Sequence, residues 1–213
     1  IDAVECRPTY SVSDEMVQCL IAGGERAFIK AVEGAEDNKE LCVSDLKNIK
    51  LTANDVVIGI AASGRTPYVI GGLEYAKEIG AVTGCIVTSP NSVIEAMVDY
   101  PVVPVTGEEA ITGSTRMKSG TAQKMVCNII STTAMIKMGK VYQNLMIDVM
   151  PTNQKLVARA HNIIATATGV TKEEAEKMYN KYGNVKKAIF ATLSGVEDPK
   201  EVEEYLDKAK GHI

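Results

Sequence analysis

An unbroken apolar run that ends in a polar turn constrains the fold more than any other stretch of the chain. It covers residues 55–62 and reads DVVIGIAA. Apolar runs without polar alternation are typical of strands in a parallel sheet that is covered on both faces. The following residues, 66–81, have helical spacing, and Pro67 suits a first helical turn. The stretch therefore predicts a strand, a turn and a helix in succession.

The same succession recurs along the first two thirds of the chain. Further strands are predicted at 16–24, 82–90 and 100–107, the last at a sheet edge because Pro104 has no N–H to donate. Helices or helical turns are predicted between them, at 24–34, 43–51, 91–99 and 112–140. Repeated strand–turn–helix units imply right-handed βαβ connections, so the predicted fold class is α/β with a doubly wound parallel sheet.

From about Pro151 the sequence becomes entirely helical. TKEE at 171–174 and DPKE at 198–201 are typical helix starts, with a capping residue followed by acids. We expect an α/β domain over 1–150 and a helical region over 151–213, whose last helices form a small bundle from about residue 171. The stretch at 144–156, NLMIDVMPTNQKL, could place Asp148 or Asn153 near a site. A helix cap at Thr152 or Asn153 explains the same residues as well.

Composition excludes several function classes. The net charge of −4 argues against a nucleic-acid partner, and no apolar stretch is long enough to span a membrane. The five cysteines contain no CxxC pair, which predicts free, mostly buried thiols in a reducing compartment. The two histidines, His161 and His212, are far apart, which argues against a His-based metal site or a Ser-His-Asp triad.

The turn at 61–67, AASGRTP, has the parts of a phosphate site. Ligands of doubly wound sheets bind beyond the carboxyl ends of the strands. Ser63 and Thr66 offer hydroxyls, the backbone around Gly64 offers N–H groups, and a helix N-terminus follows. An ordinary helix cap fits the same residues equally well. The nucleotide patterns GxxxxGK[ST] and GxGxxG are both absent from the sequence.

A second polar turn, at 112–124, precedes the longest predicted helix. It combines five hydroxyl residues with three cations: Thr112, Ser114, Thr115, Ser119 and Thr121, with Arg116, Lys118 and Lys124. This density favours a polyhydroxylated or anionic ligand. The alternative is a long helix with a polar, solvated start.

Two acids are candidates for proton transfer. Glu5 lies between Val4 and Cys6, and an apolar setting would raise its pKa enough for it to donate a proton. Glu36 could share a helical face with Glu33, or lie in a loop if the helix ends at Gly34. By pattern alone, each acid fits a solvated surface charge at least as well.

Several long motifs together resemble one family. They are ECRPTY, IAGGERAFIKAVEGAED, VVIGIAASGRTPYVIGGLEYA, TGSTRMKSGTAQKMV and IKMGKVYQNLMIDV. Over essentially the whole chain the sequence resembles the N-acetylmuramic acid 6-phosphate etherases of the sugar isomerase (SIS) superfamily. It is also similar to the animal glucokinase regulatory protein, a relative without enzymatic activity. The resemblance implies a flavodoxin-like SIS sheet and a C-terminal domain similar to ubiquitin-associated (UBA) domains.

The resemblance also implies a reaction. The family's carbon–oxygen lyases release D-lactate from N-acetylmuramic acid 6-phosphate and leave N-acetylglucosamine 6-phosphate, with no metal or redox cofactor. A cytoplasmic homodimer paired through long helices is expected. Glu5 matches the acid that protonates the departing oxygen, and Glu36 matches a second essential glutamate, the base at C2.

The binding residues follow from the same resemblance. Ser63, Gly64 and Thr66, with Arg65 beside them, match the phosphate loop. Ser114, Thr115 and Lys118 match a segment that lines the sugar pocket. A non-catalytic phosphosugar-binding regulator and a phosphosugar isomerase remain alternatives.

The sequence departs from the family at its ends. An N-terminal region with an earlier strand and a GTSGR-like phosphate turn is missing, so the sheet is expected to lack its first strand. The carboxyl end also stops inside the UBA-like region.

Overall fold

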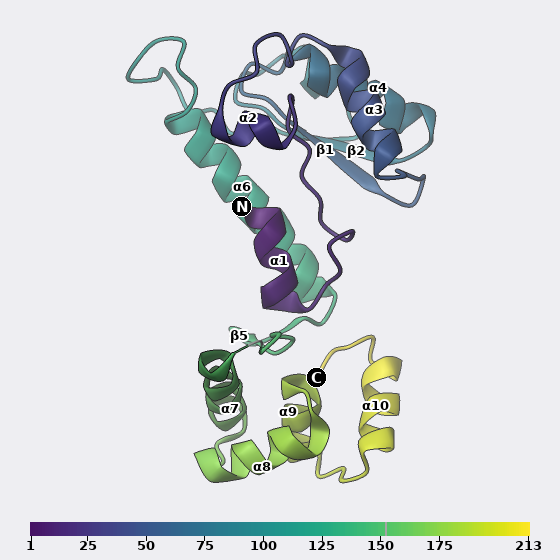
Figure 1. The fold of residues 1–213 in the computed structure, drawn as a ribbon, viewed down its shortest axis with the longest axis vertical. Helices are drawn as coiled ribbons and strands as arrows, with labels where there is room; N and C mark the ends of the chain where they lie inside the picture. The colour runs from purple at the N-terminus through teal and green to yellow at the C-terminus, as the bar shows by residue number, and fades with distance from the viewer. Residues whose placement is uncertain (152) are drawn as a thin grey trace. The chain divides into compact units, whose positions relative to one another are not determined.

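The computed structural model describes residues 1–151 and 153–213, which form two units (Figure 1). One unit contains residues 1–18 and 128–213, and the other contains residues 19–127. The long helix α6 (Lys118–Lys137) contributes to both. The domain boundary expected at residue 150 stays a prediction.

The unit 19–127 is built on a parallel sheet. Its strands β1 (Val56–Ile60), β2 (Val82–Ile86) and β3 (Tyr100–Val102) lie in that order. Helices α4 (Pro67–Glu78) and α5 (Val93–Met97) connect them, and α2 (Glu25–Ile29) and α3 (Lys39–Asn48) precede them. These connections confirm the predicted α/β class, and β3 lies at the sheet edge as expected.

Only one face of β1 is packed. Val57 joins the core that α4 forms through Leu73, which is 1% exposed. The alternate residues Val56, Ile58 and Ile60 are 62%, 37% and 44% exposed. The expectation that this strand is covered on both faces is therefore wrong for the described residues. Helix α4 packs on the opposite face, where a Cβ on Gly59 would lie 2.6 Å from Val69.

Two further expectations need correction. Residues 16–24 form turns and irregular backbone rather than a strand, because they run from one unit into the other. The helix expected at 24–34 is limited to α2. An antiparallel pair, β4 (Val141–Tyr142) and β5 (Leu145–Met146), follows α6 and was not anticipated.

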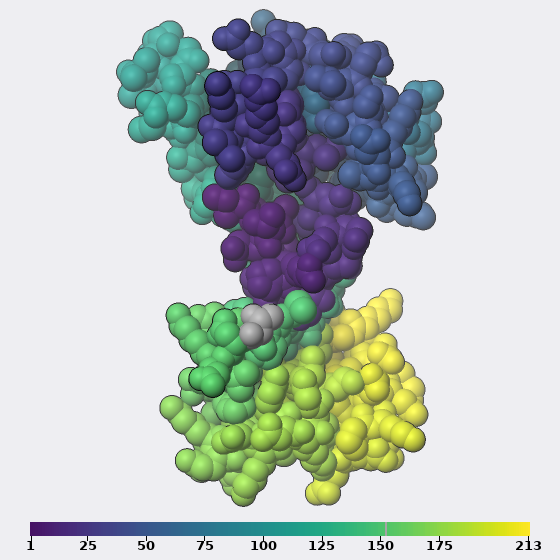
Figure 2. Space-filling view, viewed as in Figure 1, coloured from purple at the N-terminus to yellow at the C-terminus, as the bar shows by residue number. Residues whose placement is uncertain are grey.

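The other unit is mainly helical. Helix α1 (Asp2–Tyr10) packs beside α6 through Cys6 and Met135. Beyond the β4–β5 pair, four helices surround a core that includes Ile164, Ile189 and Val202: α7 (Gln154–Thr168), α8 (Lys172–Tyr182), α9 (Val185–Ser194) and α10 (Pro199–Lys208). Figure 2 shows α8 to α10, from green to yellow, as one continuous mass.

Local helix signals are confirmed where the sequence marks them. Thr171 forms a capping box with Glu174, and Asp198 caps α10 ahead of Pro199. Asn153 accepts a hydrogen bond from the Leu156 N–H at the start of α7, whereas Thr152 lies outside the described residues.

The state of three cysteines and the hydropathy of the helices also agree with what the sequence predicts. Cys6, Cys42 and Cys85 are free and buried, and burial raises the pKa of each thiol. None of the described helices combines the length and apolarity needed to cross a membrane.

Helices α3 and α4 approach so closely that Gly71 has no room for a side chain. A Cβ there would lie 2.5 Å from the Lys39 carbonyl oxygen. We expect Gly71→Ala to lower the free energy of unfolding by about 1–3 kcal/mol, because backbone must move to admit the methyl group. Gly120→Ala on α6 is the matched control, since its Cβ would meet its nearest neighbour at 3.6 Å. Urea unfolding of both variants measures the difference; equal stabilities would contradict the packing argument.

Candidate functional site

The turn at 61–66 lies at the carboxyl end of β1, and the segment after β2 supports it. The Thr88 N–H donates to the Ala62 carbonyl at 3.0 Å, and the Ile94 N–H donates to the Gly64 carbonyl at 3.0 Å. The Thr88 hydroxyl also donates to the Ala62 carbonyl at 3.1 Å. These bonds fix the turn from one side and leave its other groups for a ligand.

Gly64 has a steric reason to be glycine. Its φ is 63°, in the left-handed region, and a Cβ would lie 2.2 Å from the Ser92 hydroxyl oxygen. Ser92 is itself committed, because it caps α5 in a capping box with Glu95. The turn thus keeps its shape only with glycine at this position.

The polar groups of this turn face outward or lie half-buried. Ser63 and Arg65 are exposed, and Thr66 is half-buried at the N-cap of α4. Within the described chain, the Thr66 hydroxyl makes no capping hydrogen bond to α4. Side-chain capping of α4 therefore does not account for the threonine at this position.

Glu36 is tied to the same turn. Its carbonyl oxygen accepts a hydrogen bond of 2.9 Å from the N–H of Tyr68, in the first turn of α4. Tyr68 is in turn buried and donates to Asp45 Oδ2 at 2.6 Å, and both effects raise its pKa. The exposed Glu36 side chain therefore leaves a loop whose backbone is anchored beside the predicted phosphate turn.

The start of α6 reaches the same edge of the sheet. The Ser119 and Thr88 hydroxyls lie 3.0 Å apart, in hydrogen-bonding contact. The carboxylate of Glu109 accepts the N–H groups of Ser119 at 2.9 Å and Lys118 at 3.0 Å. These two donors hold the pKa of Glu109 below its usual range. The predicted sugar-binding segment is thereby joined to the turn at 61–66.

The predicted residues of that segment lie near the helix start. Ser114 is half-buried, while Thr115 and Lys118 are exposed. The backbone turns on itself here, since the Gly120 N–H donates to the Thr115 carbonyl at 3.0 Å. The Lys118 ammonium donates to the Glu108 carbonyl at 2.6 Å.

Thr88 and Glu109 were not predicted as site residues, and Ser119 was singled out only as one hydroxyl of a polar turn. Thr88 is detectable from sequence, because it directly follows the apolar residues 85–87 of the strand predicted at 82–90 and so falls near the ligand-binding edge. Glu109 gives no local signal, since its partners Lys118 and Ser119 are nine and ten residues away.

Glu5 belongs to the other unit, on α1. Its side chain is exposed, and the neighbouring Val4 is 71% exposed. Cys6 is the buried member of this stretch. The apolar setting expected around Glu5 is therefore not supplied by its own helix.

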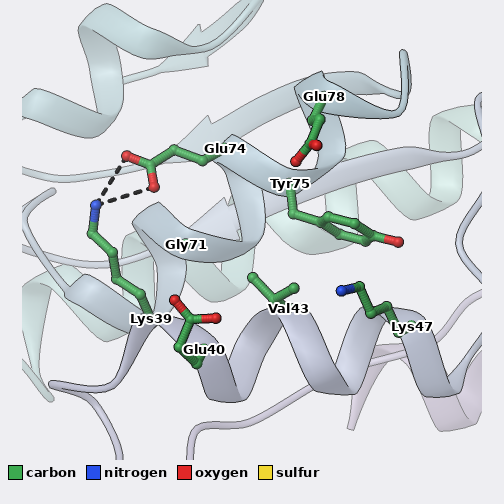
Figure 3. Close-up of a pocket in the computed structure, with 8 residues that line it drawn as sticks. All are labelled: Lys39, Glu40, Val43, Lys47, Gly71, Glu74, Tyr75 and Glu78. Carbon is green, nitrogen blue, oxygen red and sulfur yellow. Dashed lines mark hydrogen bonds and ion pairs between the residues drawn. The ribbon is translucent and has the colours of Figure 1, made fainter.

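A separate recess of about 370 Å³ lies between α3 and α4 (Figure 3). Both lysines that line it have partners: the Lys39 ammonium lies 2.9 Å from Glu74 Oε1, and the Lys47 ammonium lies over the Tyr75 ring. None of the predicted site residues lines it. Elsewhere in residues 1–151 and 153–213, no three His, Cys, Asp or Glu side chains gather as metal ligands would.

A family model matches part of the chain. The family model described as the glucokinase regulatory protein N-terminal SIS domain matches residues 5–77, which include both glutamates and the turn at 61–66.

Full-length relatives are named N-acetylmuramic acid 6-phosphate etherase. One from Exiguobacterium sp. is 56% identical over 100% of this chain and 72% of its own length. Relatives from Clostridium botulinum and Clostridium beijerinckii are 55% and 54% identical over 100% of this chain, each over 70% of its own length.

Replacing Gly64 tests the turn directly. We expect Gly64→Ala to abolish binding of inorganic phosphate and to destabilise the fold by about 1–3 kcal/mol, because the left-handed backbone and the Ser92 hydroxyl both resist a side chain. Gly107→Ala is the control: Gly107 has a φ of 69° but no neighbour within 4 Å of its Cβ. Calorimetric titration and urea unfolding measure the two effects. Phosphate affinity at the native level in Gly64→Ala would refute the assignment of this turn.

Proposed function

The chain belongs to the N-acetylmuramic acid 6-phosphate etherase family, and we propose that Glu5 and Glu36 carry its reaction. As a member, the enzyme acts on a carbon–oxygen bond and cleaves the lactyl ether of N-acetylmuramic acid 6-phosphate. The products are N-acetylglucosamine 6-phosphate and D-lactate, reached by elimination of lactate and addition of water.

The chemistry requires two carboxylates in opposed protonation states. Ring opening makes C1 an aldehyde and the C2 proton acidic. Glu36 as carboxylate removes that proton, and the ether oxygen leaves C3 as lactate while Glu5 supplies its proton. Water then adds at C3 of the unsaturated aldehyde. An ether oxygen is a poor leaving group without a proton, so neither residue alone suffices.

The observation that carries the proposal is the hydrogen bond from the Tyr68 N–H to the Glu36 carbonyl, at 2.9 Å. It anchors the loop of one carboxylate on the first turn of α4, directly after the anion turn. A base anchored beside a phosphate site suits a substrate whose phosphate and reacting carbon lie at opposite ends of one sugar. Binding energy from the phosphate then positions C2 and C3.

Two segments of the chain are assigned to different parts of the substrate. We propose that Ser63, Gly64, Arg65 and Thr66 bind the phosphate, and that Ser114, Thr115 and Lys118 contact the sugar. Hydroxyl and N–H donors at this edge also stabilise the enolate that forms when C2 loses its proton. No cofactor takes part in the proposed steps.

The finer architecture belongs to the same proposal. The sheet is the flavodoxin-like core of a SIS domain spanning 1–150, and the helices from about 171 form a UBA-like domain. The enzyme works in the cytoplasm as a homodimer. Helix α6 supports the pairing: Met125, Ile129 and Ile136 are 56%, 62% and 47% exposed. Their spacing of four and seven residues fits a helix–helix seam.

Lactate release tests the two glutamates. We expect Glu5→Gln and Glu36→Gln each to lower kcat by at least about a hundredfold, because each removes one proton transfer. Glu36→Gln should also abolish exchange of the C2 proton with deuterated water, whereas Glu5→Gln should retain it. Glu33→Gln, an exposed acid three residues away, is the control and should turn over normally. Exchange that persists in Glu36→Gln would reverse the two roles, and no lactate from the native protein would refute the etherase assignment.

A charge in the α6 stripe tests the dimer. We expect Ile129→Glu to convert the protein to monomers in sedimentation, because a carboxylate would be buried in the seam without a partner. Ala134→Glu, also exposed but about 140° around the helix from Ile129, should leave the assembly unchanged. A dimer that survives Ile129→Glu would show that α6 is not the contact.

A further inference from the structure

A buried carboxylate joins three segments of the unit formed by residues 1–18 and 128–213. Asp148 follows β5 and is 7% exposed. Its Oδ2 atom lies 2.7 Å from the Lys186 ammonium, in the first turn of α9, and 3.2 Å from the Lys140 ammonium, beyond α6. Lys186 is itself only 8% exposed. One side chain thus links the end of α6 to the C-terminal helices.

The backbone of the same residue holds the helix that carries Glu5. The Ser11 hydroxyl, at the left-handed C-cap of α1, donates to the Asp148 carbonyl oxygen. The Met150 N–H donates to the Pro8 carbonyl at 3.4 Å. Two bonds therefore connect the segment 148–150, which follows β5, to the C-terminal end of α1.

The other end of α1 is also fixed. Asp2 Oδ1 accepts hydrogen bonds from Asn128 and Ser131 on α6, and the Ser131 bond is 3.2 Å long. The helix is consequently held at both ends, through its first residue to α6 and through its C-cap to Asp148. The orientation of Glu5, in the middle of α1, depends on both attachments.

Stability alone does not account for this cluster. Burying Asp148 and Lys186, with Lys140 half-buried beside them, costs hydration that their attraction only partly offsets. Apolar residues of similar size often stabilise such a site as well or better. The charges restrict the geometry of the contact between these segments, because a carboxylate shared by two ammonium groups has few alternative arrangements. Because α1 carries the proposed proton donor Glu5, we interpret the cluster as fixing the orientation of this helix rather than as increasing the free energy of unfolding.

We propose that Lys186 is a positioning residue for Glu5, acting through Asp148 and the Ser11 bond to set the angle of α1. The inference rests on the proposed role of Glu5 as the proton donor. It gives the C-terminal helices a role in the reaction, because α9 supplies the ammonium that holds the turn containing Asp148.

Replacing one of two adjacent lysines provides the test. Lys186→Met keeps the length of the side chain and removes its charge, so we expect kcat to fall by about ten- to a hundredfold, the effect of a small misplacement of a reacting group. Affinity for N-acetylglucosamine 6-phosphate should stay within about twofold, since the phosphate turn is untouched. Lys186→Arg should restore most of kcat. Lys187→Met is the control and should leave kcat unchanged, because the Lys187 ammonium pairs at 2.8 Å with the exposed Glu203.

A double variant separates positioning from general damage. In a Glu5→Gln background, Lys186→Met should lower kcat no further, because the group it positions is already gone. A multiplied loss would show a structural defect and overturn the proposal, as would a folded Lys186→Met with native kcat. If Lys186→Met does not fold, Ser11→Ala decides: reduced kcat with native affinity supports the link, and native kcat refutes it. Native kcat in Glu5→Gln itself would instead remove the proposed function of Glu5.

Discussion

Parallel pairing of β1 with β2 is the constraint on which the candidate site depends. The strands are in register from Val56 opposite Val82 to Ile60 opposite Ile86, so both end at one edge of the sheet. Thr88, two residues past β2, can then bond both to the Ala62 carbonyl and to the Ser119 hydroxyl. A single threonine thereby joins the turn at 61–66 to the start of α6. The three segments meet only because the strands run in the same direction.

Local features of the fold were predictable because their causes are local. Caps at Thr171 and Asp198 act within three residues, so sequence alone identifies them. Burial is different. The apolar run at 55–62 is a strand, but which of its faces is covered depends on the rest of the sheet. The run at 16–24 has a similar composition but forms no strand. Apolar content alone therefore does not distinguish a sheet strand from a connection between two units.

The site was predictable to the extent that it follows strand ends. That rule located the turn at 61–66 and the hydroxyl-rich start of α6, and it would have located Thr88. It gives no information about Glu109, whose carboxylate closes a loop onto the N–H groups of Lys118 and Ser119. The anchoring of Glu36 is also invisible in sequence, because the bond to Tyr68 joins backbone atoms 32 residues apart. The resemblance to a family supplied the glutamates, which pattern alone left as surface acids.

The absence of a lysine from the phosphate turn agrees with the proposed chemistry. Nucleotide loops use a lysine because charge builds up on the phosphate as it is transferred. In the proposed reaction the bonds that change are at C2 and C3, and the phosphate stays intact. Interactions with it therefore serve binding and placement equally in the ground and transition states. Directional donors suffice for that purpose. A left-handed glycine backbone and two hydroxyls supply them, and the Ser92 oxygen, 2.2 Å from where a Cβ would sit, keeps the backbone in that form.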